Sequence, residues 1–169
     1  MAKKQENIEE IIRRAVEAGS RSASRNVKDA FKATERRLYG LPILRRKLAE
    51  DKDKLEEVKE NGPSKRSKSI TRFSKSGVRL SPEEIFEAIV SDLEATIAAD
   101  EHEIQAMERA LETIAEDEYY FTVTGRYFDN LPDEVIAGRI PCDTSTVWRN
   151  RKRLVQRLSV WLYGASAVG

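Results

Sequence analysis

Residues 116–163 read EDEYYFTVTGRYFDNLPDEVIAGRIPCDTSTVWRNRKRLVQRLSVWLY and carry the clearest structural pattern of this 169-residue chain. Apolar residues recur there at helical spacing on either side of two breaks, at 130–132 (Asn-Leu-Pro) and at 140–142 (Ile-Pro-Cys). The pattern predicts three helices: one that ends near Phe128, one at 133–139 and one that begins after the second break.

Each of these helices is predicted to have one apolar face. The residues expected on those faces are Tyr120, Val123 and Tyr127 in the first helix, Val135, Ile136 and Ile140 in the second, and Val147, Leu154, Val155, Leu158 and Leu162 in the third. The side chains at the start of the third helix, from Asp143 to Thr146, are all of types that can cap a helix N-terminus.

The third helix combines a polar start with a basic body, since residues 149–157 hold five bases and no acid. A short helix, a brief break and a second helix of this kind are typical of a helix-turn-helix, whose second helix enters the major groove of DNA. The alternative is a basic amphipathic helix that only packs in a three-helix core.

The residues expected to contact DNA fall into two groups. Arginine can form a bidentate bond to guanine, and threonine methyls can meet the thymine methyl, so the candidates for base edges are Thr144, Ser145, Thr146 and Arg149. Trp148 is expected to stack on a sugar or base edge, or else to cover the first helix. The remaining bases are expected to meet phosphates or the domain's own acids: Arg126, Arg151, Lys152, Arg153 and Arg157.

Upstream of this segment the sequence predicts one long helix. Ser81-Pro82-Glu83-Glu84 supplies an N-cap serine, a proline at the first helical position and a glutamate that completes a capping box. At 1.5 Å per residue the predicted helix is about 50 Å long. Its apolar positions recur at three, four or seven residues: Ile85, Ile89, Leu93, Ile97, Ile104, Met107, Leu111 and Ile114.

Residues 1–60 also have helical periodicity. One amphipathic stretch ends near Gly19, and a second covers residues 27–38. Leu41-Pro42 is predicted to start a further helix, because proline is compatible with the first turn. Its leucines are spaced seven apart for two and a half heptads, and the Asn-Gly-Pro at 61–63 is expected to end it.

A formal net charge of +1 hides a very uneven distribution. Residues 61–79 hold six bases and no acid, whereas residues 80–120 hold 13 acids and a single base, Arg109. Such asymmetry indicates that one part of a chain meets a polyanion while another avoids it. The alternative is an intramolecular match of acidic and basic segments, and both can hold. The acidic helix should pack on protein, either on residues 41–60 or on a second subunit in a homodimer.

Several classes of protein are not expected. No apolar run approaches the 18 residues of a membrane span, and the N-terminus has no secretory pattern, so we expect a cytosolic protein without a membrane partner. Cys142 and His102 are the only residues of their types, which argues against disulfides and zinc. Enzyme motifs are missing. We expect no catalytic activity, no metal and no cofactor.

The chain resembles two related families. Residues 116–163 resemble region 4 of bacterial sigma factors in Arg126-Tyr127, in Glu134-Val135-Ile136-Ala137 and in the run from Thr146 to Leu158. Residues 34–164 resemble the ArpU-type regulators of late phage operons. The shared features are the basic linker, the acidic helix and three motifs: Glu35-Arg36-Arg37-Leu38-Tyr39, Leu41-Pro42 and Leu162-Tyr163-Gly164.

The resemblance implies an auxiliary activator of phage or prophage late genes. Such a protein acts in the cytoplasm of a bacterial host and contacts host RNA polymerase. Two features depart from the pattern: Gly125 interrupts the first helix, and no segment corresponds to the sigma regions that melt a promoter.

We therefore expect an all-α protein in four parts: N-terminal helices at 1–60, a flexible basic linker at 61–80, a long acidic helix at 81–116 and a helix-turn-helix at 117–164. The predicted function is sequence-specific binding of double-stranded DNA by a transcription regulator. Two alternatives stay open. A ring-shaped oligomer would indicate a small terminase-like packaging protein, and an absence of DNA affinity at low salt would indicate a coiled-coil adaptor.

Overall fold

The computed structural model describes residues 10–19, 29–62 and 81–167, and these contain helices and turns but no strand. The all-α prediction is confirmed. Residues 10–19 form a short helix, and the predicted basic linker lies, from residue 63 on, outside the described residues. The other elements are α2 (Ala30–Asn61), α4 (Pro82–Glu112), α5 (Tyr120–Tyr127), α6 (Asp133–Arg139), α7 (Thr144–Tyr163) and the 3-10 helix η1 (Gly164–Ala167).

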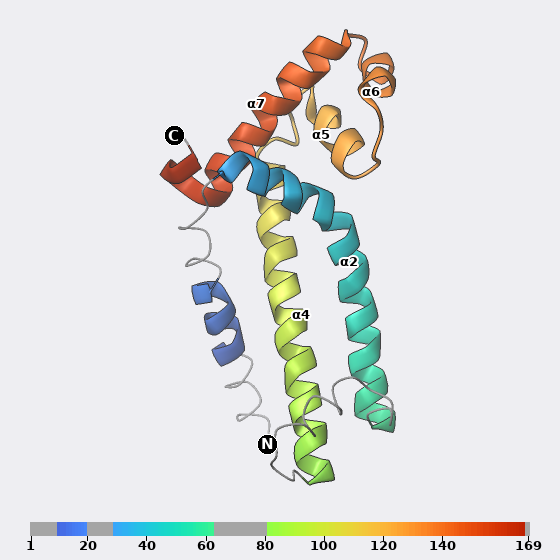
Figure 1. Ribbon diagram of the computed structural model, residues 1–169, viewed down its shortest axis with the longest axis vertical. Helices are drawn as coiled ribbons and strands as arrows, with labels where there is room; N and C mark the ends of the chain where they lie inside the picture. The colour runs from blue at the N-terminus through green and yellow to red at the C-terminus, as the bar shows by residue number, and fades with distance from the viewer. Residues whose placement is uncertain (1–9, 20–28, 63–80, 168–169) are drawn as a thin grey trace.

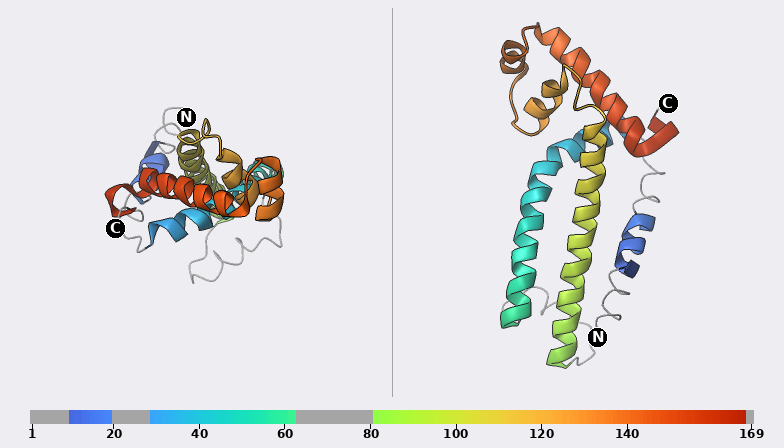
Figure 2. Two further views of the ribbon diagram at one scale, coloured as in Figure 1. Left: turned by 90° about the horizontal axis from the view of Figure 1, so that it is seen from above. Right: turned by 180° about the vertical axis from the view of Figure 1, so that it is seen from behind.

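Helices α2 and α4 lie side by side and antiparallel, and we call this pair the stem (Figure 1). Helices α5, α6 and α7 gather at one end of it and form the head (Figure 2). The acidic helix α4 therefore packs on the same chain, and the predicted intramolecular charge match is confirmed. Five ion pairs join the bases of α2 to the acids of α4: Arg37–Glu103, Arg45–Glu108, Lys47–Asp100, Lys52–Glu101 and Lys59–Glu94.

Helix α2 is continuous from Ala30 to Asn61, so the predicted helix start at Leu41-Pro42 is wrong. Pro42 lies inside the helix, where it cannot donate a hydrogen bond to the carbonyl of Leu38. Leu38 and Leu41, in the turn before this proline, are fully buried, and their burial offsets the cost of the proline. Helix α2 changes direction along its length (Figure 1), and an internal proline is a usual cause of such a bend.

Helix α4 begins and packs as predicted. The Ser81 side chain accepts a hydrogen bond from the Glu84 backbone, and the Glu84 carboxylate accepts one from the Ser81 backbone, which completes the capping box. The helix ends at Glu112 and gives way to turns that run to residue 119. Seven of the predicted apolar positions are buried: Ile89, Leu93, Ile97, Ile104, Met107, Leu111 and Ile114.

One hydrophobic core joins the stem to the head. It draws on four helices and on the turn after α4. Its buried members are Leu38, Leu41, Ile104, Met107, Ala110, Leu111, Ile114, Val123, Tyr127, Leu154, Val155 and Leu158. A second, smaller cluster of Ile136, Ala137 and Val147 lies within the head itself. Another small cluster, of Val58, Ile89 and Leu93, lies further along the stem.

Candidate nucleic-acid interface

The three helices of the head occupy the positions that the sequence predicted, and α6 has the predicted bounds. Asn130 makes the turn between α5 and α6 with a positive φ of 52°, a backbone conformation that asparagine tolerates. Gly125 does not break α5. A Cβ at this position would lie 3.2 Å from the Phe121 ring and 3.3 Å from Ile136, so glycine allows α5 and α6 to pack closely.

The buried face of α6 differs from the prediction at one residue. Ile136 is fully buried against Val147 of α7, as expected, and Ala137 is buried beside it. Val135 was expected on the same face but is 40% exposed. Successive residues of a helix point about 100° apart, so a seven-residue helix that buries Ile136 and Ala137 turns Val135 towards solvent.

The N-terminus of α7 is capped by Asp143. The Asp143 carboxylate accepts hydrogen bonds from the backbone N–H of Thr146, at 2.7 Å, and from the Thr146 hydroxyl, at 3.0 Å. The hydroxyl of Ser145 also donates to it. These bonds, the one from Ser145 foremost, lower the pKa of Asp143 to about 2. The hydroxyl oxygens of Ser145 and Thr146 still have lone pairs that can accept from a base.

The first two turns of α7 expose the side chains that a groove-binding helix would use. Thr144, Ser145 and Arg149 are exposed, and Trp148 is 54% exposed. The Lys152 ammonium lies 5.2 Å from the centre of the Trp148 ring, a cation–π contact. Within the described part of the chain, Arg149 makes no hydrogen bond or ion pair. This end of α7 is therefore accessible to a ligand.

Arg151 contacts an acid of the domain. Its guanidinium donates two hydrogen bonds to the Asp133 carboxylate, at 2.6 and 3.0 Å, and only 12% of its side chain is exposed. The bonds from Arg151 lower the pKa of Asp133. The pair joins α7 to the first turn of α6 and withdraws most of the Arg151 side chain from solvent.

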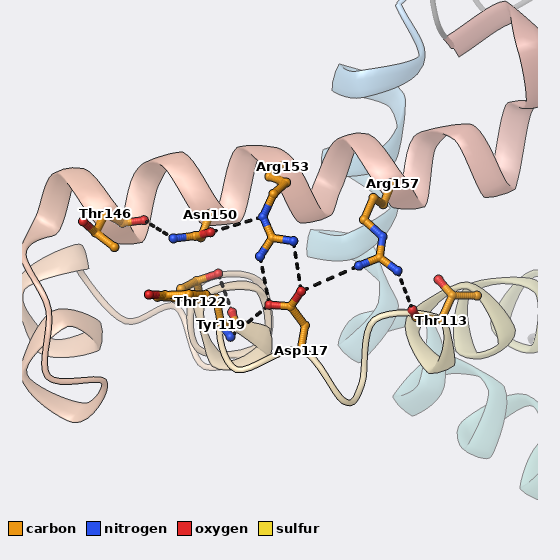
Figure 3. Close-up of polar contacts among 8 residues, drawn as sticks. All are labelled: Thr113, Asp117, Tyr119, Thr122, Thr146, Asn150, Arg153 and Arg157. Carbon is orange, nitrogen blue, oxygen red and sulfur yellow. Dashed lines mark hydrogen bonds and ion pairs between the residues drawn. The ribbon is translucent and has the colours of Figure 1, made fainter.

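Asp117, in the turn between α4 and α5, binds two further bases of α7 (Figure 3). Arg153 donates to both carboxylate oxygens of Asp117, at 3.0 and 2.9 Å. Arg157 lies 3.6 Å from the same carboxylate and donates to the Thr113 carbonyl at 3.1 Å. Arg153 and Arg157 were expected to meet either phosphates or the domain's own acids, and in the structure both contact Asp117.

Arg126, the remaining candidate, is half-buried in α5. Its guanidinium donates a long hydrogen bond, 3.4 Å, to the carbonyl of Leu131 in the α5–α6 turn. Of the six bases proposed for DNA contact, Arg149 and Lys152 are therefore the two that have no hydrogen bond or ion pair in the ranges that the structure describes.

The sequence did not reveal the polar contacts that hold the head on the stem. Tyr127 of α5 donates a 2.7 Å hydrogen bond to Glu35 of α2, and its ring packs edge-on against Tyr39 at 4.7 Å. Burial, followed by the bond to Glu35, raises the pKa of Tyr127. Arg37 pairs with Glu103 and also donates to the hydroxyl of Tyr163 at 3.3 Å. The motif at 35–39 therefore builds the joint between stem and head.

Features suited to other chemistry are few. His102 lines a cavity of about 480 Å³ between residues 10–19 and the stem, and Cys142 is half-buried in the α6–α7 turn. In the described ranges no three His, Cys, Asp or Glu residues form a group that could hold a metal ion. None of the helices described here has the length and apolarity needed to cross a membrane.

Comparisons of the chain with protein-family models, with curated proteins and with solved structures find no match.

Proposed function

We propose that this chain binds double-stranded DNA, with α6 and α7 acting as a helix-turn-helix and the first two turns of α7 entering the major groove. The observation that carries the proposal is the contrast along α7. Its later arginines bind the protein's own acids and carbonyls, while Arg149, Trp148 and Lys152 face solvent together.

Trp148 presents a large apolar surface to solvent beside the cations of Arg149 and Lys152. Large aromatic side chains are usually buried, and an exposed tryptophan beside unpaired cations is typical of a binding surface. A cation over an indole ring presents positive charge and a flat apolar face to one ligand. Nucleic acid offers the matching chemistry, because its phosphates are anionic and its sugars and bases have apolar faces.

The biological role proposed here is transcription regulation. It depends on the resemblance of Arg126-Tyr127 and Glu35–Tyr39 to the corresponding motifs of sigma region 4 and of ArpU-type regulators. We accordingly propose that the protein activates phage or prophage late genes in a bacterial cytoplasm, together with host RNA polymerase. Transcription from a late-operon template by purified polymerase tests this role: the full chain should increase product, and an unchanged yield would contradict it.

DNA binding itself is tested by fluorescence anisotropy with a labelled duplex at increasing salt. Every phosphate contact contributes about −0.9 to the slope of log affinity against log salt. We expect binding at low salt with a shallow slope, because in the described ranges only Arg149 and Lys152 of the α7 bases have no hydrogen bond or ion pair. A pool of random duplexes, selected over several rounds, should converge on one motif. No binding at low salt would indicate the adaptor instead, and binding without convergence would contradict sequence-specific recognition.

A further inference from the structure

The bases of α7 form a row whose members differ in their partners. Arg149, Arg153 and Arg157 are spaced four residues apart, so their side chains follow one side of the helix. The first has no partner in the part of the chain that the structure describes. The other two converge on one carboxylate, that of Asp117 (Figure 3). Asp117 alone thus neutralises Arg153 and Arg157, the two members of the row that lie further from the end of α7 proposed to contact the bases.

The Asp117 carboxylate is held in place by its own turn and by the arginine that it binds. Asp117 is 14% exposed, and its Oδ1 accepts a 3.1 Å hydrogen bond from the backbone N–H of Tyr119. The Arg153 side chain is also held at its Nε, which donates to Asn150 at 3.2 Å. The bonds from Arg153 lower the pKa of Asp117, so the carboxylate is ionised at neutral pH.

The guanidinium groups of Arg153 and Arg157 form ion pairs but remain accessible to solvent. The side chains of Arg153 and Arg157 are 45% and 50% exposed. Ion pairs with this degree of exposure contribute little to stability, about 0–1 kcal/mol. Solvent, and hence a phosphate group, can reach the outer edge of either arginine. What limits their attraction for phosphate is the negative charge of Asp117 beside them.

We propose that Asp117 is a specificity-determining residue for DNA binding: it neutralises Arg153 and Arg157 and so limits the number of phosphate contacts that α7 makes. This inference rests on the DNA-binding function proposed above. Phosphate contacts are the same on every sequence and dominate non-specific affinity. With two of them suppressed, a larger share of the binding free energy comes from the first two turns of α7, which meet the bases.

The test compares Asp117→Asn with Glu116→Gln in the full chain. Asparagine keeps an oxygen that can accept from the Tyr119 N–H but loses the charge. Glu116 is the adjacent exposed acid, without a hydrogen bond or ion pair in the described ranges, so its substitution removes the same charge without releasing an arginine. Circular dichroism and thermal melting establish that both variants fold. The probe is a short labelled duplex of random sequence.

We expect D117N to bind this duplex more tightly than wild type and to steepen the salt slope by about 1–2, since each released arginine adds one phosphate contact. Between about 50 and 200 mM salt its affinity should therefore fall by a factor on the order of 3 to 12 larger than that of wild type. Its preference for a selected site over random duplex should drop. E116Q should keep the wild-type slope, because it frees no contact.

A second measurement is made first in the wild-type chain, where it does not depend on how well D117N folds. Arg153→Gln should leave the salt slope unchanged in the wild-type chain, where Arg153 makes no phosphate contact. A fall in the magnitude of that slope by about 0.9 would show that Arg153 already binds phosphate, and would overturn the inference. In the D117N background the same substitution should remove about 0.9 from the added slope.

The outcomes separate the two proposals. If wild type binds DNA and D117N has the slope of E116Q, Asp117 does not limit phosphate contacts and this inference alone is wrong. If neither the wild-type chain nor D117N binds duplex at low salt, the DNA-binding function is wrong and the inference falls with it.

Discussion

Arg149 and Arg151 are two residues apart on α7 and have opposite surroundings. Arg151 is nearly buried and bound to Asp133, whereas Arg149 is exposed and has no partner in the described ranges. Helical geometry explains the difference, because residues two apart point about 200° away from each other. The sequence predicted base contacts for Arg149 and left Arg151 to phosphates or the domain's own acids, because the approach of Asp133 to α7 depends on the fold. The difference is a matter of tertiary contacts: Arg151 joins α7 to α6, and Arg149 is left accessible to a ligand.

Substitution of Arg149 tests this division. We expect Arg149→Ala to weaken binding to the selected duplex by about 1–3 kcal/mol and to relax specificity at one base position. The control is Arg46→Ala, which removes an exposed positive charge from α2 and leaves α7 unchanged. Anisotropy titrations of both variants on selected and random duplexes give the comparison. Equal losses on the two duplexes would remove Arg149 from the residues that read bases.

The Arg151–Asp133 pair is expected to stabilise the head. Asp133→Ala leaves a nearly buried guanidinium without its partner, so we expect the free energy of unfolding to fall by about 1–3 kcal/mol. A double-mutant cycle with Arg151→Met, measured by urea denaturation, isolates the coupling between them. The exposed pair Arg46–Glu50 is the control and should couple by less than about 0.5 kcal/mol. A similar coupling for both pairs would contradict this account.

Asp143 should make α7 sensitive to acid. Its pKa is about 2 in the folded protein and 3.8 without these contacts, so the unfolded chain binds the proton more readily. The stabilisation is therefore complete above about pH 4 and is lost as the pH falls towards 2. Asp143→Asn keeps an acceptor at the cap, so its melting temperature should fall less between pH 5 and pH 2 than that of wild type. Asp129→Asn, at an exposed loop position, should behave as wild type, and a D143N profile equal to it would contradict the assignment.

At the scale of the element, capping signals predicted helix ends correctly, whereas the proline at position 42 led to a wrong prediction of a helix start. The capping box at Ser81 and the helix end at Gly62 could be predicted because the residues that form each signal lie within a few positions of one another in the sequence. The continuity of α2 through Pro42 could not be read in this way. It depends on burial of Leu38 and Leu41 against helices more than 60 residues away, and this burial offsets the local cost of proline.

The capping box of α4 offers a test at this scale. Ser81→Ala removes the acceptor for the Glu84 N–H, so we expect a loss of about 1 kcal/mol in stability. Ser91→Ala is the matched control, because Ser91 is exposed in the middle of the same helix. Since alanine favours the helix interior, this control should be neutral or slightly stabilising. Chemical denaturation of the two variants measures the difference, and equal effects would show that the cap does not stabilise α4.

At the scale of the whole molecule, the stem and the head share one core. The sequence divided the chain into consecutive segments, and nothing in their spacing indicated that residues 35–41 would meet α5 and α7. Those contacts join positions about 90 to 130 residues apart, as in Tyr127–Glu35 and Arg37–Tyr163. The cap and the exposed polar start of α7 were predictable because they depend on the local order of residues, and the contact of this end with DNA stays a prediction.

A shared core predicts cooperative unfolding. Leu38→Ala, in the stem, should destabilise the protein by about 2–5 kcal/mol, because Leu38 is fully buried. The loss should be the same when followed by circular dichroism, which reports all helices, and by tryptophan fluorescence, since the chain's two tryptophans lie in α7. Separate transitions for the two signals would show that the head folds independently of the stem.

The central claim, that the first two turns of α7 contact DNA, is tested most directly by the emission of Trp148. In a Trp161→Phe background Trp148 is the only tryptophan, and it is 54% exposed beside Lys152. Addition of the selected duplex should change this emission with the midpoint seen by anisotropy. Trp161, about 20 Å further along α7, should not respond in the matching Trp148→Phe background. Binding that leaves the Trp148 emission unchanged would contradict the claim.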